Sequence, residues 1–101
     1  MAIIDRINGE HAEFTITDKF TFSDSSEFRK KLTGTIEQKV KSLAINLNGL
    51  NFMDSSGLGM FMVALKECQV HHIDLAIYQP RGDVKLLLQM TKSYERFKIV
   101  D

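Results

Sequence analysis

The chain opens with two short runs rich in β-branched and aromatic residues. These runs, "AIIDRI" (2–7) and "HAEFTI" (11–16), are separated by "NGE". The Asn8-Gly9 pair readily adopts the positive φ of a tight turn. The pattern predicts an antiparallel hairpin, followed by a loop around "TDKF" (17–20).

A helical spacing follows in "SDSSEFRKKLTGTIEQKV" (23–40), where apolar residues recur every four positions, at Phe28, Leu32 and Ile36. Ser and Asp residues precede this stripe as capping candidates, and Glu27 stands where a capping box would need it. We expect the first helix here. Gly34 lies inside it at a cost of about 1 kcal/mol relative to alanine, so the helix is expected to end or bend there.

The second half of the chain alternates between strand and helix periods. "SLAINLNGL" (42–50) reads as a central strand, and "IDLAIY" (73–78) reads as another. Between them a helical stripe begins, formed by Leu58, Phe61, Met62 and Leu65. "GDVKLLLQMTK" (82–92) predicts a further helix and "FKIV" (97–100) a last short strand.

This order of elements predicts the fold class. Strand, helix, strand and helix in succession imply right-handed crossovers between parallel strands, here attached to an antiparallel hairpin. The expected architecture is α/β, a mixed sheet of four to five strands with helices packed on it.

Composition limits the classes of function. With 101 residues, 44% hydrophobic and 26% charged, the chain has the size of one globular domain, residues 1–101. Thirteen basic residues balance thirteen acidic ones without long blocks of either sign, which argues against a nucleic-acid binder. No basic leader or run of about 18 apolar residues is present, so we expect a cytoplasmic protein without membrane insertion. The single cysteine, Cys68, suits a small core residue, and no catalytic, cofactor or metal residues are expected.

The most informative stretch is "MDSSGLG" (53–59), which lies between a strand-like and a helix-like run. The first backbone N–H groups of a helix lack partners, so Asp54 or Ser55 is expected to cap them. Capping does not explain Gly57 and Gly59, each of which costs roughly 0.5 to 1 kcal/mol in a helix. These glycines indicate that something approaches the backbone closely.

A helical wheel built on the Leu58 stripe leaves a different set of residues facing outward: Ser56, Gly59, Met60, Val63 and Glu67. Met60 and Val63 would then be apolar side chains exposed beside serines. This predicts a small docking patch for a partner.

"FMDSSGLGMF" after an apolar strand resembles the signature of the STAS domain, as found in bacterial anti-sigma factor antagonists, and the likeness covers nearly the whole chain. It implies a phosphorylation-switched binding protein without enzymatic activity. The unphosphorylated form would bind an anti-sigma factor that is also a serine kinase of histidine-kinase-like fold, and a PP2C-type phosphatase would restore that form. The partner surface would include Asp54, Gly57, Gly59, Met60 and Val63.

The phosphoacceptor that the resemblance implies is Ser55, the serine directly after the motif aspartate. The helical wheel instead places Ser56 on the outward stripe, so both serines remain candidates. Two other functions compete. A STAS domain also serves as a subunit of lipid or anion transporters. A serine at a strand-to-helix turn also suits a small hydrolase. The hydrolase elbow, however, requires glycine two residues before the serine, where Met53 and Asp54 stand here, and no histidine spacing marks a base.

Overall fold

The computed structural model describes residues 2–101. Its helices and strands are β1 (Ala2–Asn8), β2 (His11–Phe20), the 3-10 helix η1 (Phe22–Asp24), α1 (Ser25–Glu37), β3 (Ser42–Asn46), β4 (Leu50–Met53), α2 (Ser55–Val70), β5 (Asp74–Tyr78), α3 (Gly82–Met90), the 3-10 helix η2 (Ser93–Glu95) and β6 (Lys98–Val100).

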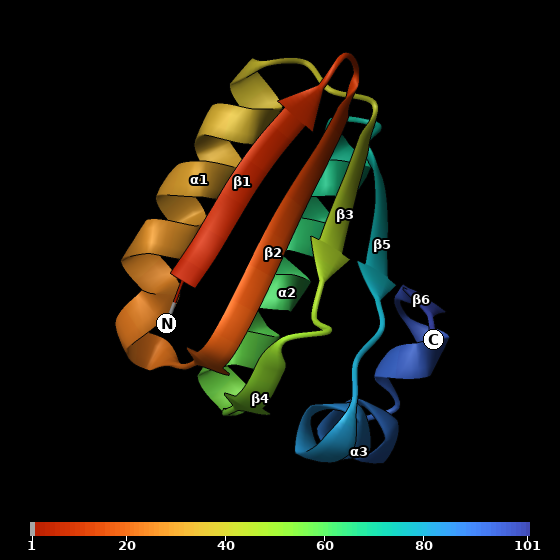
Figure 1. The fold of residues 1–101 in the computed structure, drawn as a ribbon. Coiled ribbons are helices and arrows are strands. Elements are labelled where there is room, and N and C mark those ends of the chain that lie inside the picture. The colour runs from red at the N-terminus through yellow and green to blue at the C-terminus, as the bar shows by residue number, and fades with distance from the viewer. Residues whose placement is uncertain (1) are drawn as a thin grey trace.

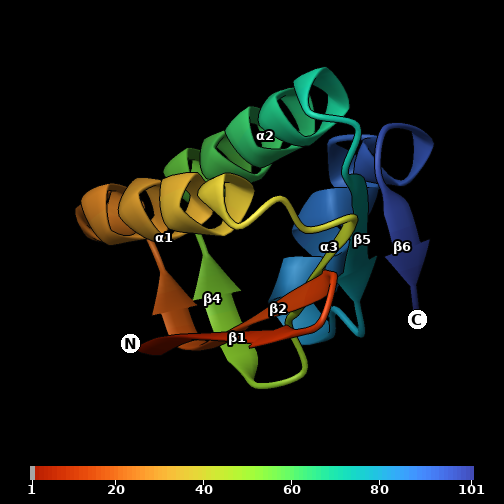
Figure 2. The ribbon, with the colours of Figure 1, turned by 90° about the horizontal axis from the view of Figure 1, so that it is seen from above.

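The strands form one mixed sheet in the order β1-β2-β3-β5-β6, with β4 paired to the far end of β2. Within residues 2–101, only the β1–β2 pair is antiparallel, and β2, β3, β5 and β6 run parallel. Helices α1 and α2 lie together on one face of β1, β2 and β3, as the two views show (Figures 1 and 2). This arrangement confirms the predicted α/β class, with β3 in the centre of the sheet.

The predicted hairpin is confirmed at its turn. Asn8 pairs with His11 across a two-residue connection, and Gly9 has a φ of +63°. This positive φ lies in the region that glycine adopts without strain, which explains why the chain reverses here.

The prediction of a loop at residues 17–20 is wrong, because β2 continues to Phe20. The extension pairs with β4, which the sequence pattern did not separate from the strand before it. A bulge interrupts this pairing at Asp18, whose φ is +66°. Through β4 the sheet reaches six strands instead of the four to five expected.

The start of the first helix also differs from expectation. The capping box lies at η1, where the Thr21 backbone N–H donates to the Asp24 carboxylate at 2.8 Å, so Glu27 does not form it. Helix α1 runs through Gly34 without ending there. The apolar stripe is nevertheless correct, because Phe28 and Leu32 are buried and Ile36 packs against the core.

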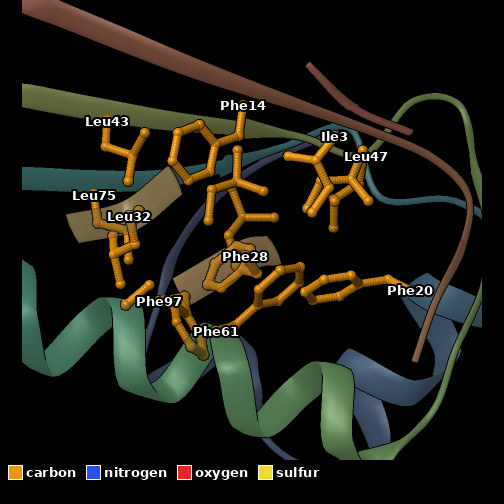
Figure 3. Close-up of a cluster of buried hydrophobic side chains, with 14 of the residues drawn as sticks. Ile3, Phe14, Phe20, Phe28, Leu32, Leu43, Leu47, Phe61, Leu75 and Phe97 are labelled. Atoms are coloured by element: carbon orange, nitrogen blue, oxygen red, sulfur yellow. The ribbon is translucent and has the colours of Figure 1, made fainter. Parts of the chain in front are cut away.

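Four phenylalanines form the centre of the core (Figure 3). Phe20 at the end of β2 stacks on Phe61 of α2 with ring centroids 5.3 Å apart. Phe28 of α1 contacts both rings, at 5.2 Å and 6.1 Å, and meets Phe14 of β2 edge-on at 5.8 Å. The cluster therefore fastens both helices to the same strand.

Cys68 lies in the core, as predicted. It is buried on α2, and this burial, with a smaller contribution from the charge of Glu67, raises the pKa of its thiol to about 11. A thiol with such a pKa is a packing group, since the thiolate is the reactive form.

The aromatic cluster makes a direct prediction for stability. Phe28→Ala should lower the free energy of unfolding by about 3–5 kcal/mol, because it removes a fully buried ring and leaves a cavity. Leu86→Ala, at a residue of α3 that is 51% exposed, should change it by no more than about 0.5 kcal/mol. Urea unfolding of both variants tests this. Equal losses would show that the cluster does not organise the core.

Candidate functional site

The candidate site lies where β4 ends and α2 begins. Asp54 is the N-cap of α2, and its Oδ1 accepts a hydrogen bond from the Gly57 backbone N–H at 2.8 Å. Its other oxygen, Oδ2, accepts from the backbone N–H of Phe22 at 3.4 Å. The Asp54 backbone N–H donates to the Phe20 carbonyl, also at 3.4 Å. One residue thus caps the helix and ties it to the end of β2 and to η1.

Gly57 is required by the close approach of α2 to β2. It is buried, and a Cβ added there would lie 2.6 Å from Met53 Cγ and 2.7 Å from the Phe20 carbonyl oxygen. The expectation of a close approach to the backbone is correct, but the approaching group belongs to this chain. Gly57 is therefore not on the surface that a partner would touch.

Gly59 differs from Gly57. A Cβ added there meets nothing within 4 Å among the described residues, and the residue is half-buried. Internal packing therefore does not require this glycine. The space next to its Cα is open.

The two serines are in different environments. Ser55 is exposed and is the first residue of α2, whereas Ser56 is half-buried. Within residues 2–101 neither side-chain hydroxyl makes a hydrogen bond, because Asp54 provides the cap. The positive end of the helix dipole favours a negative group at this position.

The helical wheel predicted for α2 is rotated relative to the structure, although Phe61 faces the core as expected. The stripe that faces the core consists of Gly57, Phe61, Ala64 and Cys68. Leu58, Met62 and Leu65, which were expected there, are half-buried on the flank of the helix. Three of the four residues in this stripe are small, and Gly57 lets the start of the helix approach the sheet closely, while Phe61 fills the core beside it.

The same rotation corrects the predicted patch. Met60 and Val63 are half-buried and pack against the core, so they are not exposed as expected. A groove of about 260 Å³ lies between α1 and α2. Val63 and Glu67 line it from α2, and the residues that line it from α1 are Arg29, Leu32, Thr33 and Ile36. Met60 and Val63 therefore help to hold α2 in place and expose only part of their surface.

No histidine lies within hydrogen-bonding distance of Ser55 or Ser56 in the described part of the chain. His71 and His72 are exposed just beyond the far end of α2, and His71 Nε2 is 4.0 Å from Glu67 Oε1. His11 instead contacts a different serine, with its Nδ1 2.5 Å from Ser42 Oγ.

Sequence reasoning missed one neighbour of the motif. Phe22 hydrogen-bonds through its backbone to Asp54, yet its ring is 74% exposed. The sequence signal for Phe22 is that it is an aromatic residue that fits neither the strand pattern before it nor the helical pattern after it. Elsewhere in residues 2–101, no three His, Cys, Asp or Glu residues gather into a metal site, and none of the helices combines the length and apolar character of a membrane span.

The fold and the site now allow comparison with known proteins. The STAS domain model matches residues 2–101, so the chain belongs to the STAS domain family.

Solved structures share the fold at low sequence identity. The anti-sigma factor antagonist SpoIIAA in its unphosphorylated form is 20% identical, with a TM-score of 0.79 over 99% of this chain and 88% of that one. The phosphorylated form of SpoIIAA, a Bacillus cell fate determinant, is 19% identical, with a TM-score of 0.78 over 99% and 92%. A sulfate transporter family protein from Wolinella succinogenes is 14% identical, with a TM-score of 0.80 over 95% and 80%.

The two glycines of the motif provide a matched test of this geometry. Gly57→Ala should destabilise the protein strongly, because its Cβ would collide with the Phe20 backbone. Gly59→Ala should be neutral or stabilise by up to about 1 kcal/mol, because alanine is the better helix former and has open space. Thermal unfolding of the two variants measures the difference. Equal midpoints would contradict the close contact of α2 with β2.

Proposed function

We propose that this protein is a regulatory binding protein, not an enzyme, and that phosphorylation of Ser55 switches it. The unphosphorylated form binds a serine kinase of histidine-kinase-like fold that acts as an anti-sigma factor. Phosphorylation by that kinase releases the complex, and a PP2C-type phosphatase restores the binding form. Residues 1–101 act as a single domain in the cytoplasm, where the kinase has access to ATP.

The observation that carries this proposal is that Asp54 caps α2 while the neighbouring Ser55 is exposed. Asp54 satisfies the Gly57 N–H, so the Ser55 hydroxyl is exposed and has no structural bond to lose. A phosphate there adds a charge of about −1.5 to −2 at the helix end that tolerates it best. The fold therefore survives the modification while its surface changes charge.

Ser55 is favoured over Ser56 because a kinase must surround the acceptor hydroxyl. Ser55 is exposed whereas Ser56 is half-buried, so Ser55 is the more accessible of the two residues. In support of a switch without unfolding, SpoIIAA has been solved in both phosphorylation states, and both forms resemble this chain equally well, with TM-scores of 0.79 and 0.78.

The partner surface centres on Ser55 and Gly59. The open space next to the Gly59 Cα permits close approach, and the accessible parts of Met60 and Val63 extend the surface along α2. Asp54 and Gly57 serve this surface indirectly, because they hold the first turn of the helix against β2.

Phosphate mapping tests the proposal. The purified protein is incubated with ATP and, one at a time, with the serine kinases of histidine-kinase-like fold from its source organism, and the modified peptide is located by mass spectrometry. One phosphate should appear in "MDSSGLG", on Ser55. Ser55→Ala should abolish it and leave the protein bound to the kinase. Ser55→Asp should mimic release only in part, because one carboxylate carries less charge than a phosphate.

Ser26→Ala is the matched control, since Ser26 is also an exposed serine in the first turn of a helix, here α1. This variant should be phosphorylated like the wild type. Phosphate on Ser56 would move the acceptor by one residue. A protein that none of these kinases modifies at either serine would refute the switch.

A further inference from the structure

The outer edge of β1 is unpaired. In the part of the chain that the structure describes, β1 pairs with β2 alone and lies at one end of the sheet. The two strands are joined by a two-residue connection, which makes Asn8 and His11 a hydrogen-bonded pair. Such pairs alternate along an antiparallel ladder, so Ile3, Asp5 and Ile7 direct their backbone N–H and C=O groups away from β2. These groups form a template for another extended strand.

A groove of about 520 Å³ lies beside this edge, between β1 and α1. Asp5 and Ile7 line it from β1, and Lys30 and Gly34 are among the residues that line it from α1. The two elements run in the same direction, and α1 projects beyond β1 at the edge of the sheet (Figure 1). The Lys31 Nζ lies 2.8 Å from Asp5 Oδ1 and joins them. A strand added to β1 would therefore lie along the overhanging flank of α1.

Gly34 widens this groove without a reason in the fold. It lies in the middle of α1, where glycine costs about 1 kcal/mol relative to alanine. A Cβ added there meets nothing within 4 Å among the described residues, so internal packing does not require the glycine. Its missing side chain leaves space between α1 and β1 for a side chain from another molecule.

The groove also defines which side chains fit it. Lys30 is exposed and forms no ion pair within residues 2–101, so it can pair with an added acid. Lys30 and Gly34 are one turn apart, about 6 Å along α1. Alternate side chains of a strand lie on one face with a similar spacing, about 6.6 Å. One extended segment could therefore place an acid opposite Lys30 and an apolar side chain opposite Gly34, beside Ile7, which is 43% exposed.

A second copy of this chain does not suit the same edge. Two β1 strands paired about a two-fold axis would form one continuous sheet with both α1 helices on the same face. Because α1 already projects past the edge (Figure 1), its copy would occupy the same space. The register that pairs most of the outward groups also places the two Asp5 side chains opposite each other, and like charges repel there. The edge therefore suits a segment that brings no helix of its own.

We propose that the groove between β1 and α1 binds an extended segment of a partner protein, which adds to the sheet at the β1 edge and carries an acidic and an apolar side chain two positions apart. Backbone hydrogen bonds to Ile3, Asp5 and Ile7 supply affinity, and the two side chains supply selectivity, as is general for strand addition. No residue of this groove belongs to the "MDSSGLG" motif, so the inference does not rest on the proposed switch.

A phage-displayed library of random nonapeptides, panned against the purified protein, tests the proposal. The enriched peptides should share an acidic and an apolar residue two positions apart. A synthetic peptide of that sequence should slow amide hydrogen exchange at Ile3, Asp5 and Ile7, measured by NMR. It should leave Ile4 and Arg6 nearly unchanged, because their amides already bond to β2. Failure to enrich such peptides, or protection only at other amides, overturns the proposal.

Matched variants of α1 test the groove with the same synthetic peptide. Gly34→Leu fills the open space and should weaken binding by about tenfold or more. Its thermal unfolding midpoint should not fall, since leucine is the better helix former. Thr33→Leu is the control, because it adds the same side chain one position earlier, on the flank that lines the α1–α2 groove, and it should bind within about twofold of the wild type. Wild-type affinity of Gly34→Leu contradicts the proposed site.

Charge reversal and oligomeric state test the occupant. Lys30→Glu should weaken binding of the acidic peptide several-fold, and a peptide with lysine in place of the acid should recover the loss. An unchanged affinity for both peptides refutes the proposed segment. Sedimentation velocity should show a monomer. A dimer that Ile7→Pro dissociates would assign the edge to self-association and likewise refute a partner segment, since proline there removes an outward N–H and no bond to β2.

Discussion

The contact between the first turn of α2 and the end of β2 is the constraint on which the site depends. Gly57 allows this contact, because any side chain would collide with the Phe20 carbonyl. The Phe20 ring stacks on Phe61, one turn further along the same helix. Backbone proximity and aromatic packing thus act on the same two elements. The serine pair is held in position by the core and does not lie on a free loop.

Asp54 connects this buried contact to the surface. Its two carboxylate oxygens accept hydrogen bonds from α2 and from η1, so its side chain joins two segments that are far apart in the sequence. The cap is complete without Ser55, whose hydroxyl is exposed. A negative group added at Ser55 would therefore remove no hydrogen bond that holds the first turn of α2.

The elements that the sequence predicted correctly are those that depend on residues adjacent in the chain. The hairpin turn at Gly9 and the strand at 74–78 follow from residues adjacent in the chain, and both are present. β4 was missed because it has only four residues and its identity as a strand depends on pairing with residues 18–20, more than thirty positions earlier. The extension of β2 was missed for the same reason, since the two segments form strands only together.

The sequence by itself determined that an acid, two serines and two glycines stand where a strand gives way to a helix, because caps and turns depend on adjacent residues. Only the tertiary structure decided which residues of α2 face the core. Apolar residues surround most of that helix, so its periodicity does not single out the buried side, which consists of Gly57, Phe61, Ala64 and Cys68; Gly57 permits the close approach to Phe20. That packing turns Met60 and Val63 inward and leaves Ser55 exposed, because the helix rotates to the orientation in which it lies nearest the sheet.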